Sequence, residues 1–180
     1  VFFAGNHHAD LWPLASGILS VKDWGALGDG VTDDTAKIQS CINAAIARGP
    51  GTAVFFPDGT YPSGNLVVQN ATRLVVYGNG ATIAWQGTAG AGLYIGFEFI
   101  GTLDGCVFHN LHLLGDAVVT NRHAGFWSLS GQTISNMEIR DNVIENVVLG
   151  ISLNANLAGS VRDCTIAYNR LANIVGANAG

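Results

Sequence analysis

Acidic side chains gather most densely between residues 138 and 145, where Glu138, Asp141 and Glu145 flank Arg140. Two carboxyl groups held close together can divide the roles of proton donor and base, which is the chemistry that breaks glycosidic bonds. The same residues also fit a solvated surface on which the aspartate closes a turn. The spacing therefore gives two candidate catalytic carboxylates, Glu138 and Asp141, beside an ordinary structural alternative.

A recurring asparagine extends this group to a histidine. Intervals of 31, 32 and 27 residues separate Asn79, Asn110, Asn142 and Asn169. If these asparagines are equivalent positions of a repeat, Asp141 stacks between His109 and Tyr168, although the two earlier asparagines could be off by one. We predict Glu138, Asp141 and His109 as the catalytic group, with Asp141 or Glu138 as proton donor or base.

A second group, Arg122, His123 and Trp127, lies in a segment rich in turn residues. Guanidinium groups suit the carboxylates of acidic sugars, and aromatic faces suit sugar stacking. Together with Arg140, these three residues are our candidates for substrate binding. The alternative for this group is an ordinary loop with a buried tryptophan.

Two clusters contain side chains of the kinds that bind metals. His7, His8 and Asp10 offer imidazole and carboxylate, but adjacent histidines of an extended segment rarely point the same way. The aspartates between residues 29 and 34 could supply oxygens to calcium, but their spacing matches no EF-hand loop, and turn and helix-cap roles explain them. We therefore predict neither a metal site nor a cofactor.

The element that must position these groups is the stretch from residue 21 to residue 61. Val21 to Thr35 predicts a short strand, a glycine-rich turn and a helix start. A helix is expected at about 33–48, because one apolar stripe forms from Ile38, Ile42, Ala45 and Ile46. Gly49-Pro50 ends it, and a buried strand closed by a Pro-Asp-Gly turn follows from Ala53.

The run VKDWGALGDGVTDDTAKIQ, followed by the helix and by VFFPDGTY, resembles the opening of the pectate-lyase-like superfamily. The resemblance covers about 40 residues specifically. It implies an all-β solenoid, a right-handed parallel β-helix whose N-terminal end is closed by the helix. Members of the superfamily include polysaccharide lyases, glycoside hydrolases and phage tailspike depolymerases.

The rest of the chain fits a solenoid. From residue 62 onward, short apolar pieces alternate with Gly, Asn and Asp, which predicts many short strands. Equivalent asparagines on stacked turns would lie about 4.8 Å apart and could hydrogen-bond as a ladder. We expect residues 1–20 to be a neck, 21–61 the cap and first rung, and 62–180 further rungs, incomplete at the C-terminal end because no polar cap is visible there.

The amino-acid composition limits the classes of partner that the chain could bind. The chain is 48% hydrophobic and 12% charged, with 24 glycines and a net charge of −5, so it has no basic patch for nucleic acid. It has no apolar run of membrane-spanning length. Three widely spaced cysteines fit neither a disulfide framework nor a zinc pattern, and are expected to be small buried hydrophobes.

The resemblance implies a phage tailspike-like receptor-binding protein that binds and depolymerises a bacterial surface polysaccharide. Such a protein would be a homotrimer built partly by the apolar residues 1–20, would contact other virion proteins, and would lie in the virion tail or outside the cell. The alternatives are a secreted monomeric polysaccharide lyase or glycoside hydrolase, and a non-catalytic structural module of a virion.

Overall fold

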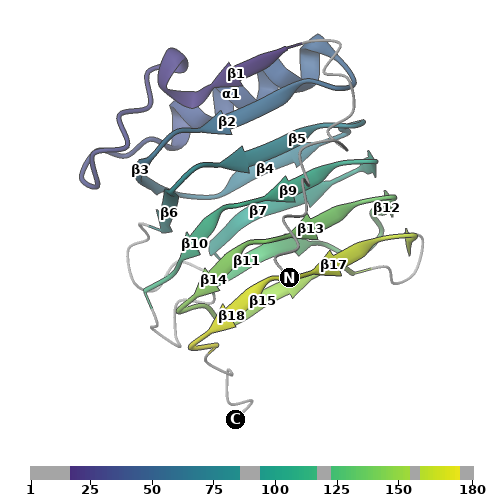
Figure 1. Ribbon diagram of the computed structural model, residues 1–180. Helices are drawn as coiled ribbons and strands as arrows, with labels where there is room; N and C mark the ends of the chain where they lie inside the picture. The colour runs from purple at the N-terminus through teal and green to yellow at the C-terminus, as the bar shows by residue number, and fades with distance from the viewer. Residues whose placement is uncertain (1–16, 86–93, 117–122, 155–158, 175–180) are drawn as a thin grey trace, which may run out of the picture.

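The computed structural model describes residues 17–85, 94–116, 123–154 and 159–174 of the 180-residue chain. Within these ranges it contains four parallel sheets and one α-helix, and the strands of each sheet stack along a common axis (Figure 1). The fold is an all-β parallel β-helix with a helix at one end, which confirms the predicted fold class.

One strand from each sheet, taken in chain order, makes a complete rung. Sheet A contains β1 (Ile18–Ser20), β2 (Ala53–Phe56), β5 (Val75–Gly78), β9 (Val107–His109), β13 (Glu138–Arg140) and β17 (Thr165–Ala167). Sheet B contains β3 (Gly59–Ser63), β6 (Ala81–Trp85), β10 (His112–Leu114), β14 (Val143–Glu145) and β18 (Arg170–Ala172). Sheet C contains β4 (Leu66–Gln69), β7 (Tyr94–Ile100), β11 (His123–Ser128) and β15 (Leu149–Ser152). Sheet D contains β8 (Thr102–Asp104), β12 (Thr133–Ser135) and β16 (Ser160–Arg162).

The strand pairing fixes which residues are equivalent on successive rungs. In sheet A, one continuous series of partners runs through Ala53, Val75, Val107, Glu138 and Thr165. These partners are 22, 32, 31 and 27 residues apart. The first rung is the shortest, because in place of a sheet D strand it has only an isolated bridge between Thr72 and Asp104.

The core of the solenoid is apolar, because alternate residues of each strand point inward. On β9, Phe108 faces the core, whereas Val107 and His109 face outward. Four buried phenylalanine rings stack inside the middle rungs, with centroids 5.1 to 6.1 Å apart: Phe97, Phe99, Phe108 and Phe126. Such ring pairs add to the stabilisation from burial alone.

The helix α1 (Thr35–Arg48) closes the N-terminal end of the solenoid, as predicted (Figure 1). Its buried stripe consists of Ile38, Cys41, Ile42 and Ala45. It contacts β1, β2 and β4, so it covers the core where a further rung would otherwise be needed.

A single side chain caps the free edge of sheet C. The Nε2 atom of Gln39 on α1 donates to the carbonyl oxygen of Val67 on β4, and the N–H of Val67 donates to Oε1 of Gln39, both at 2.8 Å. The amide thus replaces the hydrogen bonds that a neighbouring strand would make. An edge occupied in this way is a poor template for pairing with another chain.

The segment before α1 differs from the predicted strand. The strand is β1, which lies in the last part of the predicted neck, and Val21 begins a 3₁₀ helix, η1 (Val21–Trp24). Gly25 follows with φ 89° and donates to the carbonyl of Lys22, while Ala26 donates to the carbonyl of Val21. These two bonds turn the chain out of sheet A, and glycine adopts the required left-handed conformation at little cost.

The three aspartates of this segment serve turns rather than a calcium site. Asp29 accepts bonds from Val31 and Thr32, and Asp33 accepts bonds from Thr35. The two oxygens of the buried Asp34 accept from the N–H groups of Leu27 and Gly28. No group of three or more His, Cys, Asp or Glu side chains with metal-ligand placement occurs in the described ranges.

The three cysteines are free thiols. Cys41 and Cys106 are buried as predicted, and burial raises the pKa of Cys41 to about 12 and that of Cys106 to about 11. Cys164 is only half-buried, because it lies on the last described rung. Among the residues that the structure describes, none belongs to a helix long and apolar enough to cross a membrane.

Candidate functional site

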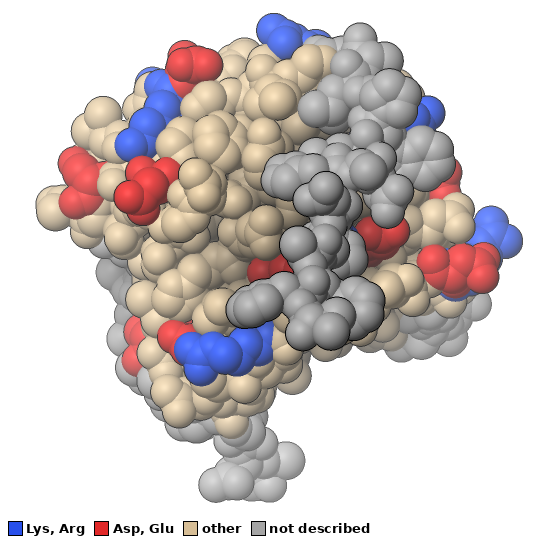
Figure 2. All heavy atoms as spheres, in the orientation of Figure 1, with Lys and Arg blue, Asp and Glu red and all other residues tan. Residues whose placement is uncertain are grey.

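The outer face of sheet A changes character along the solenoid axis. Its first outward column runs from Ala53, Val75 and Val107 to Glu138. The second runs through Phe55, Tyr77 and His109 to Arg140. The face is therefore apolar and aromatic near the cap and charged at β13, and the next strand, β17, places the uncharged Thr165 and Ala167 at the same positions. In Figure 2, which has the orientation of Figure 1, most of the described surface on this side is tan, and the charged atoms lie in small separate groups.

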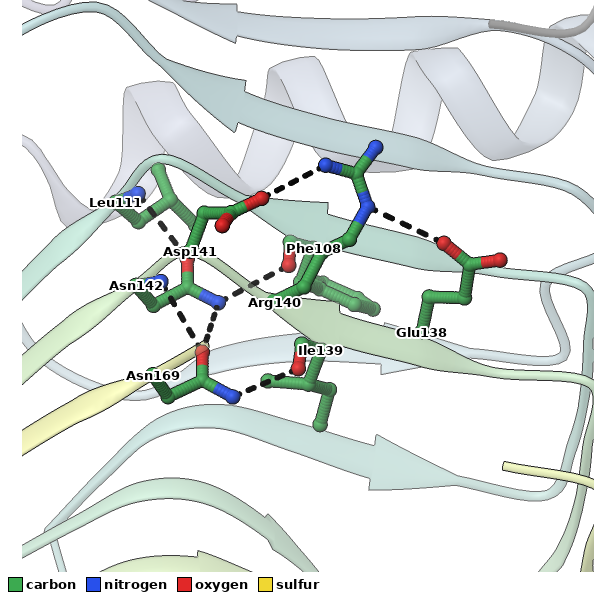
Figure 3. Close-up of polar contacts among 8 residues, drawn as sticks. All are labelled: Phe108, Leu111, Glu138, Ile139, Arg140, Asp141, Asn142 and Asn169. Carbon is green, nitrogen blue, oxygen red and sulfur yellow. Dashed lines mark hydrogen bonds and ion pairs between the residues drawn. The ribbon is translucent and has the colours of Figure 1, made fainter. Parts of the chain in front are cut away.

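Three charged residues on and beside β13 form one ion-pair group. Arg140 donates from Nε to Glu138 Oε2 at 3.2 Å and from Nη1 to Asp141 Oδ2 at 2.8 Å (Figure 3). The Arg140 side chain is 23% exposed, against 46% for Glu138 and 39% for Asp141. We call these residues the charged triad. The guanidinium holds both carboxylates on the surface of the solenoid.

The predicted column of His109, Asp141 and Tyr168 is wrong at its first member. His109 pairs with Arg140, so Asn110 is the residue equivalent to Asp141. Asn110 and Asp141 both adopt left-handed backbone conformations, with φ of 55° and 56°. Tyr168, with φ 57°, continues the same corner, which confirms the second half of the column. Asparagine and aspartate tolerate this conformation better than most residues.

His109 occupies a buried position on the neighbouring rung. Its ring stacks on that of Tyr77, with centroids 5.4 Å apart and planes 8° from parallel. Burial raises the pKa of Tyr77 above its ordinary value, because it disfavours the phenolate. The structure therefore places His109 beside Arg140 in an aromatic column, not beside the two predicted carboxylates.

A ladder of amides anchors the corner next to Asp141 (Figure 3). The buried Asn142 accepts from the N–H of Leu111 and donates to the carbonyl of Phe108 on the preceding rung. It also donates from Nδ2 to Oδ1 of Asn169 at 3.0 Å. Asn169 in turn donates to the carbonyl of Ile139. The predicted asparagine ladder is thus confirmed for its last pair, and it fixes the turn that carries Asp141.

A cavity of about 380 Å³ adjoins the charged triad where sheet D meets sheet A. Side chains from four successive corners between sheets D and A line it, among them Arg73, Asp104, Asn136, Glu138, Asp163 and Thr165. It holds three carboxyl groups and one guanidinium. Of the predicted catalytic residues, the cavity includes Glu138. Sequence reasoning missed its other charged residues, because they come together only through the register of the rungs.

The carboxylates of this cavity are not equivalent. Asp104 accepts hydrogen bonds from Ser135 Oγ and Asn136 Nδ2, both at 2.7 Å. These bonds, that from Ser135 first, hold the pKa of Asp104 below its ordinary value of 3.8. Asp104 is therefore a fixed acceptor that joins two rungs. Glu138 and Asp163 are the members that can be assigned acid–base roles.

A further polar group, on sheet B, was also missed by sequence reasoning. The His112 ring lies between Thr82 Oγ1, 3.1 Å from Nδ1, and Glu145 Oε2, 3.2 Å from Nε2. Arg170 on the next rung pairs with the other oxygen of Glu145. The carboxylate is thus engaged from two sides. We interpret this group as a polar link between successive rungs, because His112 and Arg170 both bind the carboxylate of Glu145.

The predicted substrate-binding residues are dispersed. Arg122 lies outside the described residues, and His123 begins β11. Trp127 is half-buried and outward-facing on sheet C, with Glu98 as its partner on the neighbouring strand. Only Arg140 adjoins the cavity, through its ion pair with Glu138. The candidate metal ligands His7, His8 and Asp10 also lie outside the described residues.

Comparison with known families places residues 18–96 in the family model described as rhamnogalacturonase A/epimerase, pectate lyase-like. The mannuronan C5-epimerase AlgE2 of Azotobacter vinelandii is 49% identical over 72 residues, which are 36% of this chain and 7% of that protein. The plasmin and fibronectin-binding protein A of Streptococcus pneumoniae is 56% identical over 43 residues, 24% of this chain and 6% of that protein. The chain thus spans a small fraction of these relatives.

Two solved structures extend the likeness beyond the cap. ORF18 of Geobacillus virus E2 superposes with a TM-score of 0.60 at 27% identity, covering 73% of this chain and 26% of the viral one. The A-module of the Azotobacter vinelandii epimerase AlgE4 superposes with a TM-score of 0.53 at 23% identity, covering 83% of this chain and 50% of the module. The second likeness bears on the fold alone.

Proposed function

Since this chain is a parallel β-helix of the pectate-lyase-like type, we propose that it belongs to a phage tailspike-like receptor-binding protein that binds and cleaves a bacterial surface polysaccharide. The likeness to a viral protein supports the phage setting. The observation that carries the chemistry is the cavity beside the charged triad, which brings Glu138 and Asp163 together with Arg73. Carboxylates and a guanidinium are the groups that glycan cleavage and acidic-sugar binding require.

In this proposal Glu138 transfers a proton at the scissile bond. It lines the cavity and keeps one oxygen on Arg140, so the guanidinium orients the carboxyl group. Arg73 lines the same cavity and suits a sugar carboxylate. Asp141 contacts the same guanidinium outside the cavity, so we assign it to substrate contact or to the support of Arg140. Trp127, with His123 and Arg122, remains a proposed contact for sugars.

The test is depolymerase activity on a panel of capsular polysaccharides, measured as new sugar ends, in the protein in which this chain occurs. Glu138→Gln should lower turnover by about 100- to 10,000-fold, the range for loss of an acid–base group. Asp141→Asn should keep the left-handed corner and cost less. Asp23→Asn, an exposed substitution on η1, is the matched control. Full activity of both Glu138→Gln and Asp163→Asn would refute the assignment.

A second function is favoured by the sequence relatives. Several mannuronan C5-epimerases and the alginate lyase 7 of Azotobacter vinelandii match 36–45% of the chain at 42–49% identity. We therefore also propose a secreted enzyme that acts on a polyuronate. Incubation with mannuronan tests this second function. Epimerisation changes the sugar without creating new ends of the polymer chain, whereas lyase action creates an unsaturated end.

Assembly and location form part of the proposal. A tailspike-like protein would be a homotrimer on the virion, in contact with other virion proteins, and an enzyme or adhesin would act outside the cell. The viral neighbour and the pneumococcal relative support a virion or extracellular setting. Sedimentation equilibrium at several concentrations distinguishes a trimer from a monomer. A non-catalytic structural module of the virion is the remaining alternative, and it would show no activity on capsule.

A further inference from the structure

Four polar side chains occupy the outer face of sheet B, one on each of four successive rungs (Figure 1). They are Thr82 on β6, His112 on β10, Glu145 on β14 and Arg170 on β18. Successive residues of a strand point to opposite faces, and the residues next to the first three belong to the core: Ile83, Leu113 and Ile144. The register makes Thr82 and His112 direct partners on adjacent strands, about 4.8 Å apart.

The contacts of these side chains follow the order of the rungs. Thr82 Oγ1 lies 3.1 Å from Nδ1 of His112, and Nε2 of the same ring lies 3.2 Å from Oε2 of Glu145. Arg170 binds the other oxygen of Glu145. An ionised carboxylate only accepts hydrogen bonds, so Nε2 of the neutral ring carries the hydrogen and Nδ1 accepts from the Thr82 hydroxyl. A hydroxyl, an imidazole base and a carboxylate that fixes its tautomer thus follow one another.

This group is accessible from outside the solenoid. The His112 side chain is 32% exposed and that of Glu145 is 20% exposed, and Thr82 is half-buried. Arg170 is 65% exposed, and an ion pair with so exposed a partner contributes little to stability. Cohesion between rungs therefore does not account for the ordered hydroxyl and imidazole on the inner side of Glu145.

We propose that Thr82, His112 and Glu145 act as nucleophile, general base and orienting carboxylate in the hydrolysis of esters. The same three roles perform acyl transfer on unrelated folds and are recognised by geometry rather than by position in the sequence. The substrate class is a carboxylic ester that an open strand face admits, such as an acyl group on a sugar hydroxyl. The proposal goes beyond the proposed function and does not depend on it, because the cavity beside the charged triad contains none of these residues.

Water is the second reactant of this reaction. Thr82 Oγ1 attacks the carbonyl carbon while its proton passes to Nδ1 of His112. The tetrahedral intermediate expels the alcohol, which takes that proton, and the acyl group remains on Thr82. Water then attacks the acyl group, with His112 again accepting and returning the proton, and the acid leaves. Ester and water give acid and alcohol, and Glu145 stabilises the imidazolium that forms in each half of the reaction.

Hydrolysis of p-nitrophenyl acetate by the protein in which this chain occurs tests the nucleophile. Thr82→Val keeps the shape of the side chain and removes its hydroxyl, so the rate above that of buffer should fall by about 100-fold or more. Thr82→Ser keeps the hydroxyl and should stay active. Thr60→Val is the matched control and should keep the full rate, because Thr60 is the equivalent residue one rung nearer the cap. Full activity of Thr82→Val would show that the imidazole acts alone and would overturn the proposal.

The acyl intermediate provides the second test. Protein mixed with excess p-nitrophenyl acetate, quenched in acid and digested should yield, by mass spectrometry, an acetylated peptide that contains Thr82. His112→Gln should abolish this acetylation, with circular dichroism showing the β-helix intact. Acetyl groups confined to His112 or to other residues, or the absence of acetylated Thr82, would overturn the proposal.

Glu145 is assigned as a positioning residue, and its role has a separate readout. Glu145→Gln should lower kcat for p-nitrophenyl acetate by about 10-fold or more and leave KM unchanged, because the imidazolium forms only during the reaction. Glu145→Asp should restore part of the loss. An unchanged kcat in Glu145→Gln would remove Glu145 from the proposed group and overturn the proposal as stated.

Discussion

At the scale of single residues, the amide ladder is the most local source of stability near the site. Asn142 is 1% exposed and satisfies the N–H of Leu111 and the carbonyl of Phe108. Asn142→Ala would leave both backbone groups without these partners, at about 1–3 kcal/mol each. We expect the free energy of unfolding, measured by urea denaturation, to fall by roughly 2–4 kcal/mol.

Asn173→Ala is the matched control for this prediction. Asn173 forms the neighbouring ladder with Asn146, but it is exposed. Asn173 also adopts a left-handed conformation, with φ 51°, which alanine tolerates less well, so its loss should cost about 1 kcal/mol and still less than Asn142→Ala. Equal effects of the two substitutions would show that burial of the ladder contributes nothing.

The link through Asp104 makes stability depend on pH. Its folded-state pKa lies below the ordinary 3.8, so its contribution is complete above that value and is lost as the pH falls through the folded-state pKa. In Asp104→Asn, the stability lost between pH 6 and pH 3 should be smaller than in the unmodified chain. Urea titrations at both pH values measure this. Ser135→Ala should act in the same direction, since Ser135 is the main cause of the shift. An unchanged pH dependence in both variants would contradict the role of Asp104.

At the scale of elements, the cap helix α1 packs on the solenoid through a buried apolar stripe. Ile42 is fully buried on the core-facing side of α1, so Ile42→Asp would place an unpaired charge in the core. We expect a loss on the order of 4 kcal/mol, or complete unfolding, in thermal or urea melts. Asn43→Asp, on the exposed side of the same turn, should cost about 0.5 kcal/mol or less. A tolerated Ile42→Asp would mean that α1 does not close the solenoid.

The sequence predicted elements whose signals are local. The stripe of α1 and its stop at Gly49 follow from residues within a few positions of one another. The last asparagine pair, Asn142 and Asn169, is 27 residues apart, and it was predicted because a similar short pattern surrounds both asparagines. The first strand was misplaced because Val21 fits a strand as well as a 3₁₀ helix by type, and only the bonds that close at Gly25 decide.

Only part of the candidate site could be predicted from the sequence, because the rest depends on the register between rungs. Asn110 and Leu111 lie at the same corner of the rung. Aligning Asn110 instead of Leu111 with Asn142 shifted the predicted register by one residue, so His109 was paired with Asp141 instead of Arg140. The cavity unites residues from Arg73 to Thr165, whose meeting depends on rungs of unequal length. Composition and spacing along the chain carry no direct record of that register.

At the scale of the whole molecule, the two ends of the solenoid differ. The last described rung exposes side chains at positions that are core positions one rung earlier: Ile166 is 52% exposed, whereas its partner Ile139 is buried. Leu171 on β18 is 46% exposed, above the buried Ile144. Exposed core positions and free strand edges favour association with another chain or segment.

We expect the 180-residue chain to associate through this rung as its concentration rises. Ile166→Lys should reduce that association in sedimentation velocity runs and change stability by about 1 kcal/mol or less, because the side chain is already half in water. Ile139→Lys, one rung earlier, should instead unfold the chain. Association that is insensitive to Ile166→Lys would place the contact elsewhere, such as on the face opposite sheet A.

The strands of sheet A all run the same way, and the rungs follow one another in chain order. No axis of symmetry exchanges the two ends of this face. A polysaccharide also has a direction, with one reducing and one non-reducing end. If such a chain lies along the solenoid, reversing it presents each sugar to a different set of groups. The parallel fold thereby makes the surface able to tell one end of a polymer from the other.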